Sequence, residues 1–152
     1  MANTKEKDYK SSVTLMIVGD AIEPTEISKL LCMTPSQSWR KGDRRVYKSG
    51  HVFTYKHGGW KMFAPDEERC LYVEQQILAW VARLQNKETE IDRILKDGAL
   101  VVLDCYLASD GPIPLELSRE IMLQVATLGL HISAHIFQDQ SNEETVPHLD
   151  MV

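Results

Sequence analysis

Asp104, His131 and His135 are the residues of this chain whose types and placement could carry proton-transfer chemistry. Asp104 interrupts the apolar run 100–107, and the two histidines lie on one face of a predicted strand at 131–137. A carboxylate inside an apolar strand is costly unless it is paired, so we expect Asp104 to face the open side of a sheet or to contact one of these histidines. Such a contact is either a structural ion pair or an acid–base pair. Because the sequence supplies no nucleophile or oxyanion donor beside it, an enzyme built on this pair is only an alternative.

Metal and cofactor chemistry are not indicated by the spacing of the other candidate ligands. His131 and His135 stand about 13 Å apart along an extended strand, whereas both would have to lie about 2 Å from a shared zinc ion. His51 and His57 flank a predicted hairpin, but no cysteine or carboxylate stands at a supporting spacing. The chain also lacks the glycine-rich phosphate loops and the common hydrolase and metalloprotease motifs. We therefore expect no metal site, no cofactor and no catalytic residue.

A basic, aromatic segment at 39–63 is the main binding candidate. It holds seven Lys and Arg residues and one acid, a net charge of +6, which leaves −11 for the rest of a chain whose net charge is −5. It also holds six of the eleven aromatic residues. Cations interleaved with aromatic rings can bind an acidic protein surface through hot-spot contacts, or they can grip phosphates and stack on bases. The same pattern also fits a hairpin whose rings fill the core while its charges are solvated.

The predicted partner-binding residues all come from this segment and are Trp39, Arg40, Lys41, Asp43, Arg44, Arg45 and Trp60. Gly42 and Asp43 follow a tryptophan and two cations and predict a tight turn, because an Asp side chain accepts hydrogen bonds from neighbouring backbone N–H groups. A ligand-binding loop is the alternative. The net charge of −5 and the pI near 5.5 favour a protein partner over nucleic acid, since a dedicated nucleic-acid binder is usually basic overall.

Three cysteines, Cys32, Cys70 and Cys105, predict neither a disulfide framework nor a zinc motif, because their number is odd and no C-x-x-C pair occurs. Each lies in an apolar pattern, so we expect buried free thiols and a reducing, cytoplasmic environment. No apolar run approaches the roughly 20 residues that a membrane helix needs. The polar segment 1–12 also lacks the apolar core of a signal peptide. We expect no membrane association.

The apolar patterns predict one α+β domain over residues 13–137, between a flexible N-terminal segment at 1–12 and a loose acidic tail at 138–152. Strands are predicted where β-branched and aromatic residues run together or alternate, at 13–18, 46–47, 52–55, 60–63, 100–107 and 131–137. Helices are predicted from Pro24 to before Pro35, over 70–84, around 88–95, and from Pro114 to 128. This order predicts a mainly antiparallel sheet backed by helices, close to a ferredoxin-like two-layer sandwich.

Glycines divide the basic segment into its strands. Ser49-Gly50 is predicted to turn the chain between the first and second short strands, and His57-Gly58-Gly59 between the second and third. Glycine suits both places because it adopts positive φ without a steric penalty. The segment is therefore predicted to form hairpins.

Several short motifs occur together along the chain, in the order Ile17-Val18-Gly19-Asp20, Pro24, Pro35, Trp39-Arg40-Lys41-Gly42-Asp43, Gly59-Trp60 and Leu128-Gly129-Leu130. In this combination the chain resembles the bacterial domain-of-unknown-function family four-two-seven-nine, over roughly 13–137. The block that ends in Trp-x-x-Gly-Asp is the most specific part. The resemblance implies a small stand-alone bacterial α+β domain and no known reaction. It also implies a gene neighbourhood, because small orphan domains of this type are often encoded beside secreted toxins as immunity proteins.

These patterns together predict a non-catalytic protein-binding domain, with a bacterial immunity or antitoxin-like protein that neutralises a toxin as the leading case. One alternative is a nucleic-acid-binding module that uses residues 39–63, and the other is an uncharacterised enzyme. An exposed sheet edge or open sheet face can support self-association, so the chain is expected to be a monomer or a homodimer.

Overall fold

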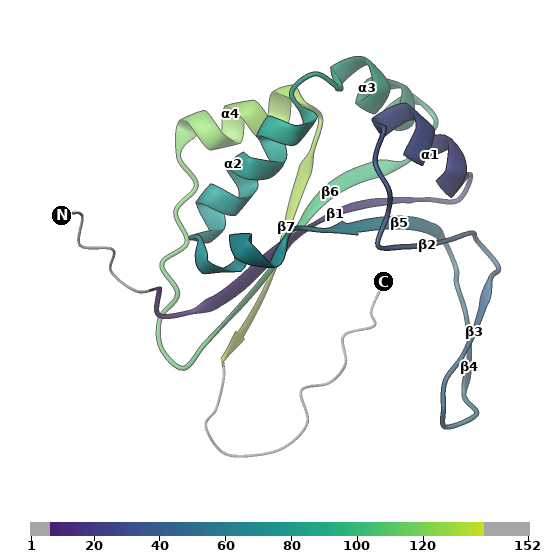
Figure 1. The fold of residues 1–152 in the computed structure, drawn as a ribbon, viewed down its shortest axis with the longest axis horizontal. Helices are drawn as coiled ribbons and strands as arrows, with labels where there is room; N and C mark the ends of the chain where they lie inside the picture. Colours follow the sequence, from purple (N-terminus) through teal and green to yellow (C-terminus); the bar gives the residue numbers. More distant parts are fainter. Residues whose placement is uncertain (1–6, 139–152) are drawn as a thin grey trace.

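A computed structural model describes residues 7–138 as two layers, a five-stranded sheet and a layer of helices on one of its faces (Figure 1). A separate two-stranded sheet extends from one edge of the first. The elements in chain order are β1 (Lys10–Gly19), α1 (Pro24–Leu31), β2 (Gln37–Trp39), β3 (Arg44–Val46), β4 (Val52–Thr54), β5 (Gly58–Phe63), the 3₁₀ helix η1 (Asp66–Cys70), α2 (Val73–Leu84), α3 (Glu88–Lys96), β6 (Leu100–Ser109), α4 (Arg119–Thr127) and β7 (His131–Gln138).

Strand β1 lies at the centre of the main sheet, whose strand order is β2-β5-β1-β6-β7. It is antiparallel to β5 on one side and to β6 on the other. Strands β6 and β7 are parallel, because α4 returns the chain to the end of the sheet where β6 began. The prediction of an α+β fold with a mainly antiparallel sheet is confirmed. The finer ferredoxin-like assignment stays a prediction.

The alternation of apolar residues in β1 decides which face of the sheet the helices cover. Val13, Leu15 and Ile17 are buried, while the residues between them are half-buried and face the other way. Strand β6 repeats the pattern, with Leu103 and Leu107 fully buried on the same side. One face of the sheet therefore forms the floor of the core.

Helix α2 supplies the layer that packs on this floor. Val73, Ile77, Trp80 and Leu84 are fully buried and recur at helical spacing. The indole N–H of Trp80 donates a hydrogen bond of 2.9 Å to the carbonyl oxygen of Val13 on β1. A buried indole N–H needs such an acceptor, so this bond ties the helix layer to the central strand.

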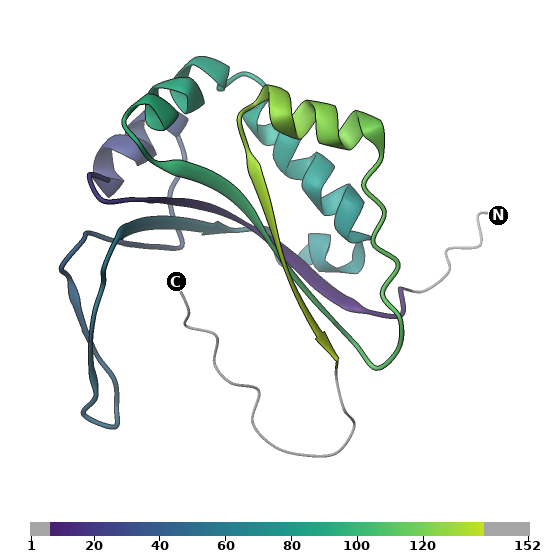
Figure 2. The same cartoon turned by 180° about the vertical axis from the view of Figure 1, so that it is seen from behind.

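The opposite face of the sheet has no helix over it in residues 7–138 (Figures 1 and 2). By register it carries Met16 and Lys61 near β5, and Asp104, Tyr106 and His135 near β7. Figure 1 shows the β3–β4 pair leaving the β2–β5 edge and extending to this helix-free side. The two features therefore border the same side of the molecule.

Helix α2 begins later than the sequence pattern predicted. The pattern placed its first residue at Cys70, but Cys70 ends η1 and is exposed. The N–H of Val73 donates to the hydroxyl of Tyr9 at 3.1 Å, and the N–H of Tyr72 donates to the side chain of Gln75 at 3.1 Å. N–H groups in a first helical turn have no acceptor within the helix, so these side chains define where α2 starts.

Helix α4 was also predicted to begin too early. The pattern placed its start at Pro114, whereas the helix starts at Arg119. Ser118 is the N-cap, because its hydroxyl accepts a hydrogen bond of 3.2 Å from the N–H of Ile121. Pro114 instead lies in the segment 110–118, which has no regular structure.

The N-terminal boundary of the domain lies earlier than the predicted residue 13. Strand β1 starts at Lys10, and Tyr9 is buried. The ammonium group of Lys7 donates hydrogen bonds to the Ser11 hydroxyl and to the carbonyl oxygens of Arg69 and Leu71. Residues 7–12 therefore belong to the fold rather than to a flexible segment. Residues 1–6 and the predicted tail beyond Gln138 lie outside the described residues.

Candidate functional site

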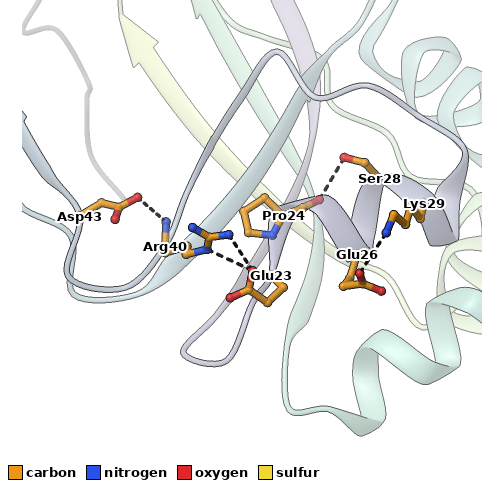
Figure 3. A network of polar contacts seen from close by, with 7 residues as sticks. All are labelled: Glu23, Pro24, Glu26, Ser28, Lys29, Arg40 and Asp43. Atoms are coloured by element: carbon orange, nitrogen blue, oxygen red, sulfur yellow. Dashed lines mark hydrogen bonds and ion pairs between the residues drawn. The ribbon is translucent and has the colours of Figure 1, made fainter.

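Residues 40–57, which we call the basic arm, begin at a tight turn that the sequence predicted. Asp43 accepts a hydrogen bond of 2.9 Å from the N–H of Arg40 through its Oδ2 and donates its own N–H to the Arg40 carbonyl at 3.1 Å (Figure 3). Gly42 between them has a φ of +88°, which glycine adopts without strain. The Trp-x-x-Gly-Asp block is therefore the structural start of an extended β-hairpin.

Trp39 anchors the base of the arm by packing flat on the sheet. Its side chain is only 8% exposed and lies over Gly59 of β5, where any Cβ would overlap the Trp39 ring. Tyr55 stacks on the ring with 4.8 Å between centroids, and the Lys61 ammonium lies 5.6 Å from the ring centroid. The indole N–H donates to the carbonyl oxygen of His57 at 3.0 Å. Trp39 thus holds the arm in place and offers a partner little surface of its own.

The predicted turn at His57-Gly58-Gly59 is wrong for its two glycines. Gly58 and Gly59 are the first residues of β5, and both are buried. Their absent side chains make room for close neighbours, which for Gly59 is the Trp39 ring. The predicted turn at Ser49-Gly50 is confirmed, because Gly50 has a φ of +85° and the Tyr47 N–H donates to the His51 carbonyl across it.

Charge pairs connect the base of the arm to the segment between β1 and α1. Nη2 of Arg40 lies 2.9 Å from Glu23, and Nζ of Lys41 lies 3.4 Å from Asp20 (Figure 3 for Arg40). Nδ1 of His57 lies 2.6 Å from Oδ1 of Asp20, and these hydrogen bonds from His57 and Lys41 lower the pKa of Asp20 below its ordinary value. All five side chains are more than half exposed, so each pair contributes little stability.

The outer part of the arm is exposed on both strands. Every residue of β3 is exposed, and the Val46 side chain reaches 69% exposure. Arg44 and Lys48 are exposed too, and the Arg45 guanidinium lies 5.2 Å from the centroid of the Tyr47 ring. The basic segment of the sequence therefore forms a projecting β-hairpin with a cationic surface.

Trp60 does not belong to the candidate surface, contrary to the sequence prediction. It is fully buried on the helix-covered face, where its indole N–H donates to the Ser28 hydroxyl at 3.1 Å. The reason is the alternation of a strand, because Gly59 faces the arm and its neighbour Trp60 must face the opposite side. Of the seven predicted binding residues, Trp39, Arg40, Lys41 and Asp43 build the base of the arm, and Arg44 and Arg45 lie along β3.

Asp104 lies beside His135 on the helix-free face, which combines the two placements predicted for it. Nε2 of His135 is 3.2 Å from Oδ1 of Asp104, but this buried oxygen forms no hydrogen bond in residues 7–138, so the two groups are close without being aligned for a hydrogen bond. Ser133, the one hydroxyl residue of β7, pairs in register with Asp104. The His135 nitrogen nearest the carboxylate is Nε2. In the Ser-His-Asp triad the carboxylate contacts Nδ1 and the nucleophile contacts Nε2, so this pair uses the other ring nitrogen.

The cysteines differ from the predicted set of buried thiols. Cys32 and Cys70 are exposed, and Cys105 is buried. Cys32 was misassigned because it follows α1 in a left-handed conformation with a φ of 53°, which turns it out of the apolar stripe. Burial and, secondarily, the charge of Asp104 raise the pKa of the Cys105 thiol to about 12, so this thiol is a packing group.

Four residues of the arm base were not predicted from the sequence: Asp20, Glu23, Tyr55 and Gly59. Glu23 precedes Arg40 by 17 residues, and Asp20 precedes Lys41 by 21 and His57 by 37. No local sequence pattern connects residues at such distances. A signal for Gly59 was present, because two successive glycines before a tryptophan in a strand indicate a close approach of another group.

Comparisons with known proteins add a family match. A family model that describes a domain of unknown function matches residues 7–139. No curated protein and no solved structure matches the chain. Across residues 7–138, no helix has the length and apolar character to cross a membrane, and no cluster of three or more His, Cys, Asp or Glu side chains is placed to hold a metal ion.

Proposed function

The chain belongs to that family, the domain of unknown function DUF4279, and we propose that it binds a protein partner through the basic arm and the helix-free sheet face, without catalysing a reaction. The partner class we propose is an acidic protein surface, such as an immunity or antitoxin-like protein would meet on a toxin. The exposed cationic β-hairpin is the observation that carries this proposal.

The hairpin supports partner binding because little in the described chain stabilises its outer half. A two-stranded β-ribbon alone is marginally stable in water. Strands β3 and β4 contain no buried residue, while Val46 and Val52 are 69% and 39% exposed. A partner that covers these apolar side chains would remove this exposure. The folded base supplies the geometry that keeps the hairpin ready for such contact.

The sign of the charge favours an acidic partner. Residues 40–57 contain six cations and one acid. Arg40 and Lys41 contact acids of the β1–α1 segment, so the partner would meet chiefly Arg44, Lys48 and Lys56, which are exposed. Opposite charges across an interface raise the association rate and suppress wrong partners.

The aromatic residues of the arm favour a protein over nucleic acid. Base stacking needs a ring face open to solvent. The Trp39 ring lies between Gly59 and Tyr55, and the edge of Phe53 meets Tyr55 with centroids 5.1 Å apart. These rings already contact one another at the arm base. Nucleic-acid binding remains the alternative that the experiment below distinguishes.

Capture from an extract of the native host tests this function. We would compare the wild-type protein with the arm variant Arg44→Glu/Lys48→Glu and with a matched control, Lys96→Glu/Arg119→Glu. The control makes the same change in net charge at exposed positions of the helix layer. We expect an acidic protein that the wild type and the control retain and that the arm variant loses.

The captured protein is then purified and titrated by calorimetry, where the arm variant should bind at least about ten-fold more weakly, a difference of about 1.4 kcal/mol. Retention of the same protein by all three forms would show that the arm is not the binding site. A signal that disappears on nuclease treatment would instead establish the nucleic-acid alternative. Light scattering on the same sample decides between a monomer and a homodimer.

A further inference from the structure

A cleft between α1 and α3 lies on the helix-covered side of the sheet. It has a volume of about 240 Å³. Figures 1 and 2 show the two helices side by side above the end of the sheet where β1 finishes and β6 starts. The cleft is lined by residues of the helices and of these strand ends: Gly19, Ala21, Ile22, Glu23, Glu26, Ile27, Leu30, Arg93, Ile94, Asp97 and Ala99.

The floor of the cleft is apolar. Ile22, Ile27, Ile94 and Ala99 are each less than 9% exposed and form part of the main core. The positions nearest the sheet hold small residues, since Gly19 has no side chain and its absent Cβ would lie 3.1 Å from Ala99. The floor therefore offers a small aliphatic group an apolar surface to contact. Pockets for drug-sized ligands are larger, about 300–1,000 Å³, so the ligand must be small.

The two walls differ in charge, because the α1 wall is acidic and the α3 wall carries one cation and one acid. The α1 wall presents the carboxylates of Glu23 and Glu26, which Figure 3 shows on the first turn of the helix and just before it. Glu23 pairs with Arg40, whereas the one ion pair of Glu26 within residues 7–138 is with the exposed Lys29, three residues along the same helix, at 3.4 Å. The α3 wall presents Arg93, the one cation among the described residues that line the cleft, and the carboxylate of Asp97 at the end of the helix. An ammonium group suits Glu26, and a carboxylate suits the Arg93 guanidinium.

We propose that this cleft binds a small aliphatic α-amino acid as its zwitterion. The aliphatic side chain would lie on the isoleucine floor, the ammonium group would contact Glu26, and the carboxylate would contact Arg93. We expect both charges to contribute, because Glu26 lies on one wall and Arg93 on the other. The cleft meets the base of the basic arm at Glu23, which pairs with Arg40, whereas the partner contacts proposed for the arm lie on Arg44, Lys48 and Lys56, so the proposal does not rest on the proposed function.

An NMR titration of the ¹⁵N-labelled chain with three probes tests the proposal. The probes are L-leucine, 3-methylbutylamine, which lacks the carboxylate, and 4-methylpentanoate, which lacks the ammonium group. We expect leucine to shift the amide signals of α1 and α3 with a dissociation constant at least ten-fold below that of either analogue. Absence of shifts with leucine at 10 mM, or equal affinity for the amine, would overturn the proposal.

Variants separate recognition of the two charges. Arg93→Gln should weaken leucine binding at least about five-fold and leave binding of the amine unchanged, while Glu26→Gln should weaken both. Ala21→Phe should block the cleft, because Ala21 lines it and is exposed. The matched control is Ala82→Phe at an exposed position of α2. Unchanged thermal melting shows that each variant is folded, and undiminished leucine binding by folded Ala21→Phe protein would place the ligand elsewhere and overturn the proposal.

Discussion

Two antiparallel strand pairs in this molecule have the same hydrogen-bonding pattern and opposite environments. In β1 and β6, every second side chain is buried in the core. In β3 and β4, no side chain is buried, and the pair continues only across three register positions. The first pair is held by burial of apolar area, and the second by turn geometry at both ends and by the aromatic base.

This difference explains what each pair can do. A buried pair is specified by packing, since a shift of one residue would move its whole apolar set to the wrong face. An exposed pair has no such constraint, so its side chains can be chosen for a partner. Function is therefore expected where burial is absent, and the predictions below test how sharply the two regions differ.

The largest effect is expected from Trp60→Ala in the core. Loss of a fully buried tryptophan that also hydrogen-bonds Ser28 should lower the free energy of unfolding by about 3–5 kcal/mol. The matched change in the arm, Val46→Ala, should stay within about 0.5 kcal/mol because Val46 is 69% exposed. Urea denaturation measures both values. A loss of more than 1.5 kcal/mol for Val46→Ala would mean that the arm packs in the free protein.

Gly59→Ala tests the junction of the two regions. A Cβ at this position overlaps the Trp39 ring, so Trp39 must move and the free energy of unfolding should fall by about 1–3 kcal/mol. The control is Gly111→Ala, where an added Cβ meets no atom within 4 Å. Urea denaturation gives the stability, and tryptophan fluorescence reports the displaced ring. Equal stabilities of the two variants would contradict the anchoring role of Trp39.

Asp43→Ala should cost less and act locally. It removes one hydrogen bond to the Arg40 N–H, with an expected loss of about 1 kcal/mol. Hydrogen exchange measured residue by residue should show faster exchange at residues 40–57 and unchanged exchange in β1 and β6. If exchange in the central sheet accelerates as well, the arm and the core unfold as one unit and the contrast between them fails.

The smallest effect is expected on lowering the pH. The pKa of Asp20 is lowered in the folded protein by hydrogen bonds from His57 and Lys41. The stability that the Asp20 carboxylate adds to the arm base is therefore present above its ordinary pKa of 3.8. This stability is lost as the pH falls through the lowered pKa. A ¹³C NMR titration of the Asp20 carboxyl group should show the lowered pKa. His57→Ala should raise it towards 3.8, and the control His51→Ala should leave it unchanged.

The sequence predicted the buried half of the molecule better than the exposed half. The strands around Val13 and Leu103 and the stripe of α2 follow from periodic apolar residues, because burial imposes that period. The starts of α2 and α4 were predicted too early because the apolar stripe includes Cys70 and because Pro114 resembles a first helical residue. Tyr9, which accepts from the first N–H of α2, is distant from this helix in sequence. Ser118, the N-cap of α4, lies four residues after Pro114, where the helix was predicted to start.

The candidate site was predicted in part, since the basic hairpin and the Asp43 turn are confirmed. Trp60 was assigned to the wrong face because the register of β5 depends on β1, which lies more than 40 residues earlier. Strand β2 was missed because its three residues, which follow Pro35, are too few to show an alternating apolar pattern. The pairs of Arg40 with Glu23 and of His57 with Asp20 depend on tertiary folding and leave no local signal.

The central position of β1 has a consequence for synthesis of the chain. Its partner β6 follows roughly 90 residues later, which takes about 5–20 s at a typical translation rate. During that time Val13, Leu15 and Ile17 are made but cannot be buried between both of their final neighbours. The main sheet therefore closes only after β6 has been made, and until then β1 is an apolar strand with one edge unpaired.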